Sequence, residues 1–304
     1  MEKELIKFSK NIEKALKENK PIVGLETTII SHGMPYPENV KTALEVEEII
    51  KDNGCEPMTI GIVNGKIKCG LTNNEIEMFG STDTISKCTE RDISSSIKNK
   101  LNSALTVGAC LYVMDKLGIE VLVTGGIGGV SRSAFKDYDI SADLVALSSC
   151  NNIVVCSGMK AFMGIKETLE YLETNSVLVS VYNSDTLPLF YSRSSQIKAE
   201  NIIKDHKEII DIYKINNQLG LRKSILLCNP IEEEYSLDLT YLEEIISKSI
   251  INSEKKGIFG KDLTPFILND ISIQTGGKTL ESNVELIKSN AKLGSKISFG
   301  LCSN

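Results

Sequence analysis

The residues that could do chemistry gather in one part of the chain. A glycine-rich stretch over residues 124–130 is followed by Asp137, Asp139 and Asp143, and then by Lys160. The backbone N–H groups of a glycine loop can approach a phosphate or a sugar closely. Carboxylates suit a hard cation that prefers oxygen ligands, and a lysine beside them is a candidate nucleophile. This combination predicts an enzyme that acts on a phosphorylated sugar.

Glu26 is the candidate acid. It follows a short apolar run, 22–25, and precedes a loop that contains Gly33, Pro35 and Pro37. Ligands of open α/β sheets bind outside the carboxyl ends of the strands. Partial burial there would raise the pKa of a carboxyl group until it could donate a proton near neutral pH. The alternative is a solvated or salt-bridged glutamate.

Two lysines are candidate amines. Lys160 follows the apolar run 153–156 through Ser157 and Gly158. Burial among apolar neighbours would lower its pKa and leave a neutral amine that can attack a sugar carbonyl; the alternative is a surface lysine. Lys87 offers a flexible positive charge suited to phosphate, although the run that it opens, Lys-Cys-Thr-Glu-Arg-Asp, is also typical of a solvated helix start.

The glycine stretch and the aspartates each allow two interpretations. No Gly-Lys-Ser/Thr ends the stretch, so it is not a P-loop; it fits either close approach to an anion, with Arg132 nearby, or a plain turn. Asp139 could hold a divalent ion through one carboxylate and several waters. Ser141 could cap a helix that begins near Ala142, but a cap does not explain three aspartates in seven positions.

The elements that must position these residues alternate along the chain. Short apolar runs between helical patterns indicate a layered α/β/α fold with a largely parallel sheet. Asn64-Gly65 between two apolar runs predicts a two-residue hairpin, so the sheet is expected to be mixed. No repeat or long linker interrupts the chain, and residues 1–304 are predicted to form a single catalytic domain. The expected strands are 22–25, 58–63, 66–70, 121–124, 153–156, 177–182 and 225–228, and the expected helices are 37–52, 103–117, 165–174, 203–219, 238–253 and 280–297.

Composition excludes several classes of protein. With 41% hydrophobic and 24% charged residues the chain is of the ordinary globular kind. A net charge of −6 argues against nucleic acid as a partner. Eight cysteines without a C-x-x-C pair indicate buried, reduced thiols. No apolar run approaches the roughly 18 residues of a membrane helix, and the first residues lack the apolar core of a signal peptide, so a soluble, cytoplasmic protein without a membrane partner is expected.

Several segments, in their order, resemble the pseudouridine-5′-phosphate glycosidase family, which is related to the indigoidine synthase A proteins. These segments are 26–37, 121–130, 139–144, 168–174, 190–195, 264–266, 275–278 and 283–290. Local departures are Glu90, where more basic character is expected, and Ser131, where a histidine is common. They concern contacts to phosphate rather than the reaction.

The resemblance implies reversible cleavage of the C–C glycosidic bond of pseudouridine 5′-phosphate to uracil and ribose 5-phosphate. It implies a carbon–oxygen lyase that works through a lysine–sugar iminium (a Schiff base), with one manganese ion per subunit, in a homotrimer. The implied roles are Glu26 as proton donor, Lys160 as nucleophile, Asp139 as manganese ligand, and Lys87, Val107, Ser141, Ala142, Asp143 and Asn283 as substrate-binding residues.

Elementary chemistry agrees with that activity, because carbon is a poor leaving group. An amine that opens the ribose and forms an iminium at C1′ supplies the missing electron sink, and an acid such as Glu26 can protonate the ring oxygen. A related lysine-dependent glycosidase or lyase acting on a nucleotide with a different base is the alternative. A non-catalytic regulator would be expected to have lost Lys160 or Glu26, and a sugar kinase of the ribokinase type would carry a Gly-Ala-Gly-Asp motif, which is absent.

Overall fold

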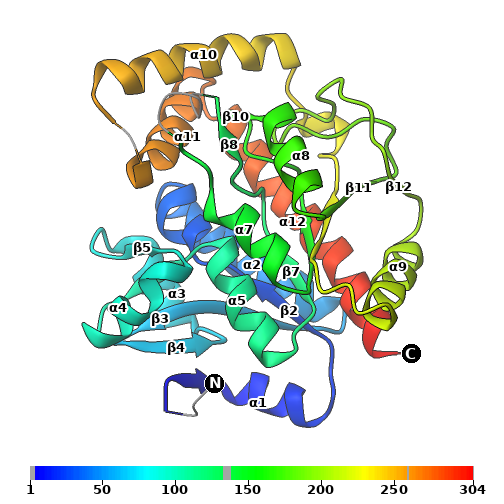
Figure 1. Ribbon diagram of the computed structural model, residues 1–304. Coiled ribbons are helices and arrows are strands. Elements are labelled where there is room, and N and C mark those ends of the chain that lie inside the picture. Colours follow the sequence, from blue (N-terminus) through cyan, green and yellow to red (C-terminus); the bar gives the residue numbers. More distant parts are fainter. Residues whose placement is uncertain (1–3, 133–137, 259, 304) are drawn as a thin grey trace.

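The computed structural model describes residues 4–132, 138–258 and 260–303 (Figure 1). Its centre is a mixed sheet of 11 strands whose main path runs β1-β4-β3-β2-β7-β9-β13-β11-β12, with β5 and β6 joined to it through β3. The strands from β3 through β2 to β12 are mutually parallel. The strands of this sheet are β1 Ile6–Phe8, β2 Ile22–Leu25, β3 Glu56–Val63, β4 Lys66–Cys69, β5 Ser86–Cys88, β6 Ser103–Leu105, β7 Val121–Val123, β9 Ile153–Cys156, β11 Leu178–Tyr182, β12 Ile202–Ile203 and β13 Ile225–Cys228, while β8 Val130–Ser131 and β10 Met163–Gly164 form a separate antiparallel pair.

The antiparallel part of the sheet contains the expected hairpin. β3 and β4 pair in antiparallel register, with Val63 opposite Lys66. The two turn residues adopt positive φ, 48° at Asn64 and 71° at Gly65. A two-residue turn of this kind matches the twist of the strands. The mixed, largely parallel sheet is therefore confirmed.

Helices cover both faces of the sheet, which makes the α/β/α layering that the sequence predicts. α2 and α12 lie on one face and α5 and α7 on the other (Figure 1). Two close contacts place α12 and α5 against the sheet: a Cβ on Gly294 of α12 would overlap the Val123 side chain of β7, and a Cβ on Gly24 of β2 would lie 2.6 Å from the terminal methyl of Met114 in α5. The helices are α1 Lys10–Lys17, α2 Glu38–Asp52, α3 Asn73–Ser81, α4 Ile93–Lys98, α5 Val107–Leu117, α7 Ala142–Ser149, α8 Ile165–Thr174, α9 His206–Gln218, α10 Leu239–Lys255, α11 Leu263–Gln274 and α12 Lys278–Cys302, with short helical turns at Ile29–Gly33, Glu90–Asp92, Glu233–Tyr235 and Gly260–Asp262.

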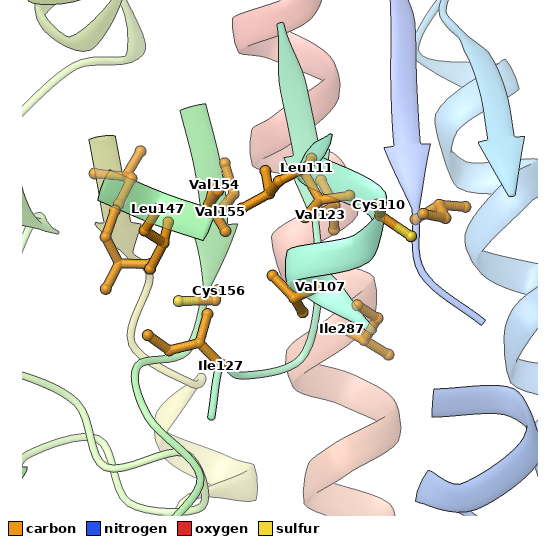
Figure 2. Packing of buried hydrophobic residues seen from close by; sticks show 14 of the residues in the cluster. Val107, Cys110, Leu111, Val123, Ile127, Leu147, Val154, Val155, Cys156 and Ile287 are labelled. Atoms are coloured by element: carbon orange, nitrogen blue, oxygen red, sulfur yellow. The ribbon is translucent and has the colours of Figure 1, made fainter. Parts of the chain in front are cut away.

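The core lies between α5, the sheet and α12. Figure 2 shows Val107 and Leu111 of α5, Val123 of β7, Val154 of β9 and Ile287 of α12 in one buried cluster. Each of these side chains is at most 3% exposed. The strands β2, β7 and β9 are thereby held rigidly from both faces.

Three helix predictions need corrected bounds. The expected helix 103–117 begins at Val107, because Ser103–Leu105 pair with β3 and β5 and Thr106 caps the helix with its hydroxyl. The expected helix 203–219 begins at His206, after the Asp205 cap. The helix predicted over 280–297 is longer and extends over Lys278–Cys302. A polar capping residue, rather than the apolar pattern, decides the first two boundaries.

The cysteine prediction is confirmed for most of the thiols. All eight cysteines are free, and seven of them are buried, whereas Cys302 near the end of α12 is exposed. Within residues 4–132, 138–258 and 260–303, no helix combines the length and the apolar character that a bilayer crossing requires.

Candidate active site

The predicted acid and the predicted nucleophile meet at one edge of the sheet. β2, β7 and β9 are adjacent and parallel, so the residues that follow them lie side by side. Glu26 directly follows β2, Thr124 follows β7, and Ser157 opens the segment from β9 to Lys160. This geometry places all three at the carboxyl ends of the strands, where ligands of open α/β sheets bind.

A cavity of about 970 Å³ opens at this edge. Eight of the nine predicted site residues line it, namely Glu26, Lys87, Val107, Asp139, Ser141, Ala142, Asp143 and Lys160. Asn283 lines a smaller adjoining cavity, which shares Glu26, Lys87 and Lys160 with the large one. The structure thus brings all nine positions together, while their individual roles stay predictions.

Glu26 is a buried carboxyl group, only 6% exposed. Burial is the largest influence and raises the pKa of Glu26, the charge of Lys160 lowers it, and the Asp143 carboxylate raises it. The Thr124 hydroxyl donates a hydrogen bond to Glu26 Oε1 at 3.0 Å. Oε2 has no hydrogen-bond partner within the described part of the chain. A carboxyl with a raised pKa and one unengaged oxygen is suited to donating a proton.

Lys160 lies close enough to Lys87 for its charge to act on the Lys87 amine. Burial lowers the pKa of Lys87, the charge of Lys160 lowers it further, and the carboxylates of Asp143, Glu26 and Asp139 raise it. Lys160 is half-buried, and its backbone N–H donates to Ile127 O at 3.0 Å. The amines of Lys87 and Lys160 therefore share one cavity with the carboxyl groups of Glu26, Asp139 and Asp143.

Lys87 and the rest of its run differ in structure. Lys87 lies in β5, and Glu90–Asp92 form a short, largely exposed helical turn; both parts of the run line the cavity. The Asp92 carboxylate accepts hydrogen bonds from the Thr89 N–H at 3.0 Å and from the Thr89 hydroxyl at 2.7 Å. The helix-start interpretation is confirmed for Glu90–Asp92, and the binding role of Lys87 stays a prediction.

The glycine loop packs against its neighbours and does not form a plain turn. It runs beside the segment that leads to Lys160, with Ser157 N–H donating to Gly125 O at 2.8 Å. A Cβ at Gly126 would lie 2.5 Å from the Phe190 ring, and one at Gly128 would overlap the Ser141 hydroxyl. These contacts require glycine. The wall between the loop, Phe190 and Ser141 is consequently very closely packed.

Arg132 does not reach the cavity, contrary to the expectation that it lies near a bound anion. Its guanidinium makes a two-pronged ion pair with Glu243 of α10, at 2.7 and 2.8 Å. Another N–H of the guanidinium donates to Ala161 O at 2.9 Å. Arg132 therefore joins the glycine loop to α10.

The Asp143 carboxylate, on the cavity wall, accepts hydrogen bonds from two backbone segments. Its two carboxylate oxygens accept hydrogen bonds from the N–H groups of Gly108, at 2.8 Å, and Gly128, at 3.0 Å. Ser141 caps α7, as predicted, by accepting from the Asp143 N–H at 3.2 Å. The Asp143 side chain thus holds the start of α5, the start of α7 and the glycine loop in one arrangement.

We expect Asp143→Ala to destabilise the protein by about 2–6 kcal/mol, because it leaves two buried N–H groups unsatisfied at about 1–3 kcal/mol each. Asp143→Asn keeps one carbonyl acceptor and should lose clearly less. Urea unfolding of both variants measures the difference. Equal losses in the two variants would show that these hydrogen bonds are not the source of the stability.

The donor atoms for a metal are few. Within the described residues no group of three His, Cys, Asp or Glu side chains is arranged as a metal cage, and Asp137 lies outside the described residues. Asp139 lines the cavity, and its carbonyl accepts from the Ser131 N–H at 2.9 Å, which fixes its backbone. One carboxylate facing a roomy cavity fits a divalent ion that keeps most of its waters.

Two threonines that hold the site together, Thr27 and Thr28, were not predicted individually from the sequence. Thr27 donates to Ile60 O at 2.8 Å and accepts from Leu105 N–H at 2.8 Å, and Thr28 donates to Leu105 O at 2.7 Å. These threonines tie the end of β2 to the end of β6. The sequence signal for these contacts was the pair of threonines directly after Glu26. Buried hydroxyl groups are usually hydrogen-bonded, so Thr27 and Thr28 could have been expected to contact a neighbouring strand.

Comparison with known proteins agrees with this geometry. The family model described as indigoidine synthase A like protein matches residues 11–300. The chain belongs to this family. Two relatives named pseudouridine-5′-phosphate glycosidase are similar over nearly their full lengths: that of Caldanaerobacter subterraneus subsp. tengcongensis is 46% identical over 296 residues (97% of this chain and 96% of the relative), and that of Clostridium botulinum is 45% identical over 297 residues (97% of each). The resemblance deduced from the sequence segments is confirmed.

Two solved structures share the fold of this family member. An indigoidine synthase A-like protein from Thermotoga maritima superposes with a TM-score of 0.90 at 32% identity, over 99% of both chains. The prealnumycin C-glycosynthase AlnA, solved in complex with ribulose 5-phosphate, gives a TM-score of 0.90 at 30% identity, over 99% of this chain and 98% of the other.

Proposed function

We propose that this protein reversibly cleaves the C–C glycosidic bond of pseudouridine 5′-phosphate to give uracil and ribose 5-phosphate. The observation that carries the proposal is the buried Glu26 carboxyl on the wall of the cavity that Lys160 also lines. Relatives at 46% and 45% identity bear the name of this activity. The AlnA enzyme, named as a C-glycosynthase, has the same fold and was solved with a phosphorylated sugar.

The first half of the reaction opens the sugar. The Lys160 amine attacks C1′ while the C1′–O4′ bond breaks, and the Glu26 carboxyl gives its proton to O4′. The raised pKa of Glu26 keeps this proton available at a higher pH than an exposed glutamate would. The amine nitrogen then loses a proton, and its transfer to the Glu26 carboxylate restores the acid.

The second half breaks the carbon–carbon bond. The base carbon attached to C1′ gains a proton, the electron pair of the C–C bond leaves with uracil, and the nitrogen lone pair forms a C1′=N iminium with Lys160. Water adds to this iminium and releases ribose 5-phosphate and the free amine. Lysine chemistry of this kind divides one difficult step into two easier ones.

Positive charge for the phosphate comes from this chain's own groups. Lys87 lies on the cavity wall, and so do Ser141 and Ala142 at the positive dipole end of α7. We assign phosphate and sugar binding to these residues, with Val107 and Asn283 as further contacts. Asp143 shapes the site through its two backbone hydrogen bonds.

Asp139 is the residue that would hold the manganese ion. When bound there, the ion supplies positive charge and fixes an oxygen of the substrate. Asp139→Asn should weaken manganese binding and lower activity, and chelation of the wild-type enzyme should lower its activity until manganese is added back. Electron paramagnetic resonance of unbound Mn²⁺ measures the binding. If the chelator leaves the rate unchanged, or if Asp139→Asn binds manganese as the wild type does, Asp139 is not the manganese ligand.

Trapping tests the proposal most directly. The protein is incubated with ribose 5-phosphate and borohydride, which reduces an iminium to a stable amine, and peptides are then analysed by mass spectrometry. The sugar adduct is expected on Lys160, and uracil release from pseudouridine 5′-phosphate is followed in parallel. An adduct on another lysine would reject the nucleophile, and the absence of uracil would reject the substrate.

The second candidate is a related lysine-dependent enzyme with a different base or aglycone. The similarity to AlnA favours it, because that enzyme is named for prealnumycin rather than for pseudouridine. The same Lys160 adduct is expected from both candidates. Release of base from a panel of C- and N-nucleotides separates them.

We also propose that residues 1–304 act as one catalytic domain, that the enzyme is a homotrimer, and that it works in the cytoplasm. Site residues from Glu26 to Asn283 line joined cavities, which supports one domain. Light scattering of the purified protein tests the trimer, and fractionation of cells tests the location.

A further inference from the structure

Asn290 lies on the face of α12 that packs against the sheet and is 0% exposed. Its Nδ2 donates to Thr124 O at 2.9 Å and to Ser157 Oγ at 3.1 Å. Its Oδ1 accepts from Asn229 Nδ2 at 3.0 Å. Thr124, Ser157 and Asn229 are the first residues after β7, β9 and β13, which are neighbouring strands. One side chain therefore joins the carboxyl ends of three strands.

Docking of α12 does not explain an amide at this position. Ile287 belongs to the buried core, and a Cβ at Gly294 would overlap the Val123 side chain, so α12 already packs closely on β7. Burying an amide among apolar groups costs free energy unless it is hydrogen-bonded. An apolar side chain would serve packing as well, whereas only a side chain with donors and acceptors can bind three strand ends at once.

The partners of Asn290 lead directly to the acid and the amine. Thr124, whose carbonyl Asn290 holds, donates its hydroxyl to Glu26 Oε1 at 3.0 Å. Ser157 opens the segment that ends at Lys160. Backbone hydrogen bonds join the segment after Thr124 to the segment after Ser157: Ile127 N–H donates to Gly158 O at 3.1 Å, and Lys160 N–H donates to Ile127 O at 3.0 Å.

We propose that Asn290 is a positioning residue, which sets the separation and orientation of Glu26 and Lys160 by joining the ends of β7 and β9. It touches no reacting atom and acts through Thr124 and Ser157. The inference rests on the proposed function for its kinetic consequence, and on the structure alone for its effect on Glu26.

Kinetics with a matched control tests the first part. Asn290→Ala should lower kcat about 100-fold, the scale of an ångström-sized misplacement, with a smaller change in KM. The control is Asn152→Ala: Asn152 is also 0% exposed, but it lies at the opposite end of β9, where its Nδ2 donates to Ile119 O at 2.7 Å. Asn152→Ala should lose stability and keep kcat within about twofold. Equal kcat values for the two variants would overturn the proposal.

Carbon-13 NMR of the Glu26 carboxyl tests the second part without a substrate, with Glu26→Gln for assignment. The Thr124 hydrogen bond lowers the pKa of Glu26, so displacing Thr124 in Asn290→Ala should raise that pKa, while Asn152→Ala should leave it unchanged. An unchanged pKa in Asn290→Ala would overturn the proposal. A shifted pKa in a protein that does not turn over pseudouridine 5′-phosphate would reject the proposed function and support the positioning role.

A second variant keeps the test valid if Asn290→Ala does not fold. Ser157→Ala removes only the arm to β9 and keeps the hydrogen bond from Asn290 to Thr124. It should lower kcat and leave the pKa of Glu26 in place. An unchanged kcat would overturn the proposal.

Discussion

Lys160→Ala is expected to abolish turnover while the protein still binds its substrate. Loss of a covalent nucleophile lowers kcat by roughly 10⁴- to 10⁶-fold, because the Lys160 amine is the proposed electron sink for the carbon leaving group. Steady-state release of uracil measures turnover, and calorimetry measures binding. Both the borohydride adduct and the turnover should disappear together.

Lys166→Ala is the matched control for this variant. Lys166 lies on α8, six residues further along the chain, is exposed and is not among the residues that line the cavity. Its replacement should leave kcat unchanged. Retained activity in Lys160→Ala, or equal losses in both variants, would remove Lys160 from the proposed chemistry.

Glu26→Gln is expected to lower kcat about 10²- to 10⁴-fold, the usual contribution of a general acid. The amide has nearly the shape of the carboxyl and can still accept from the Thr124 hydroxyl, so the cavity should keep its form. Glu47→Gln is the control. Glu47 lies on α2 and is another buried carboxyl group with a raised pKa; its Oε1 accepts a hydrogen bond from the Thr59 hydroxyl at 2.6 Å. The Glu47→Gln variant should keep kcat.

The pH dependence of Glu26→Gln carries a second expectation. The folded-state pKa of Glu26 is raised, so its stabilising contribution is complete below the unfolded pKa of about 4.5 and is lost as the pH rises through the folded value. Glu26→Gln removes the buried charge that forms above that value. Its melting temperature relative to the wild type should therefore rise with pH. In the wild type, kcat/KM should also fall with rising pH as Glu26 deprotonates. The pH profile of the variant should lack this fall. A melting-temperature difference that does not change with pH would contradict a buried, titrating acid.

The strands of the site were predictable because they are buried on both faces. Ile22–Leu25, Ile153–Cys156 and Ile225–Cys228 have the predicted bounds, since each is a continuous apolar run between polar residues. The strands Ser86–Cys88 and Ser103–Leu105 were not predicted. They are three residues long, and pairing with distant segments, rather than a local pattern, makes them strands.

The site was predictable at the level of positions and not at the level of partners. Glu26 and Lys160 follow recognisable strands, and parallel strands bring such residues to one edge. The partners of Arg132, Asp143 and Asn290 depend on contacts across tens to more than one hundred residues, for example 111 for Arg132 with Glu243 and 166 for Asn290 with Thr124. Local patterns contain no information on such approaches.

Because α12, the last helix, covers the face of the sheet that carries β2, β7 and β9, the order of synthesis has a consequence. A nascent chain on the ribosome exposes that apolar face until residues up to about Ile297 have emerged, and exposed faces of this kind aggregate readily. At that stage Glu26 and Lys160 have already been synthesised, whereas Asn283 and Asn290 of α12 are synthesised later. We therefore expect the Lys160 amine to be correctly placed only after α12 has docked on the sheet.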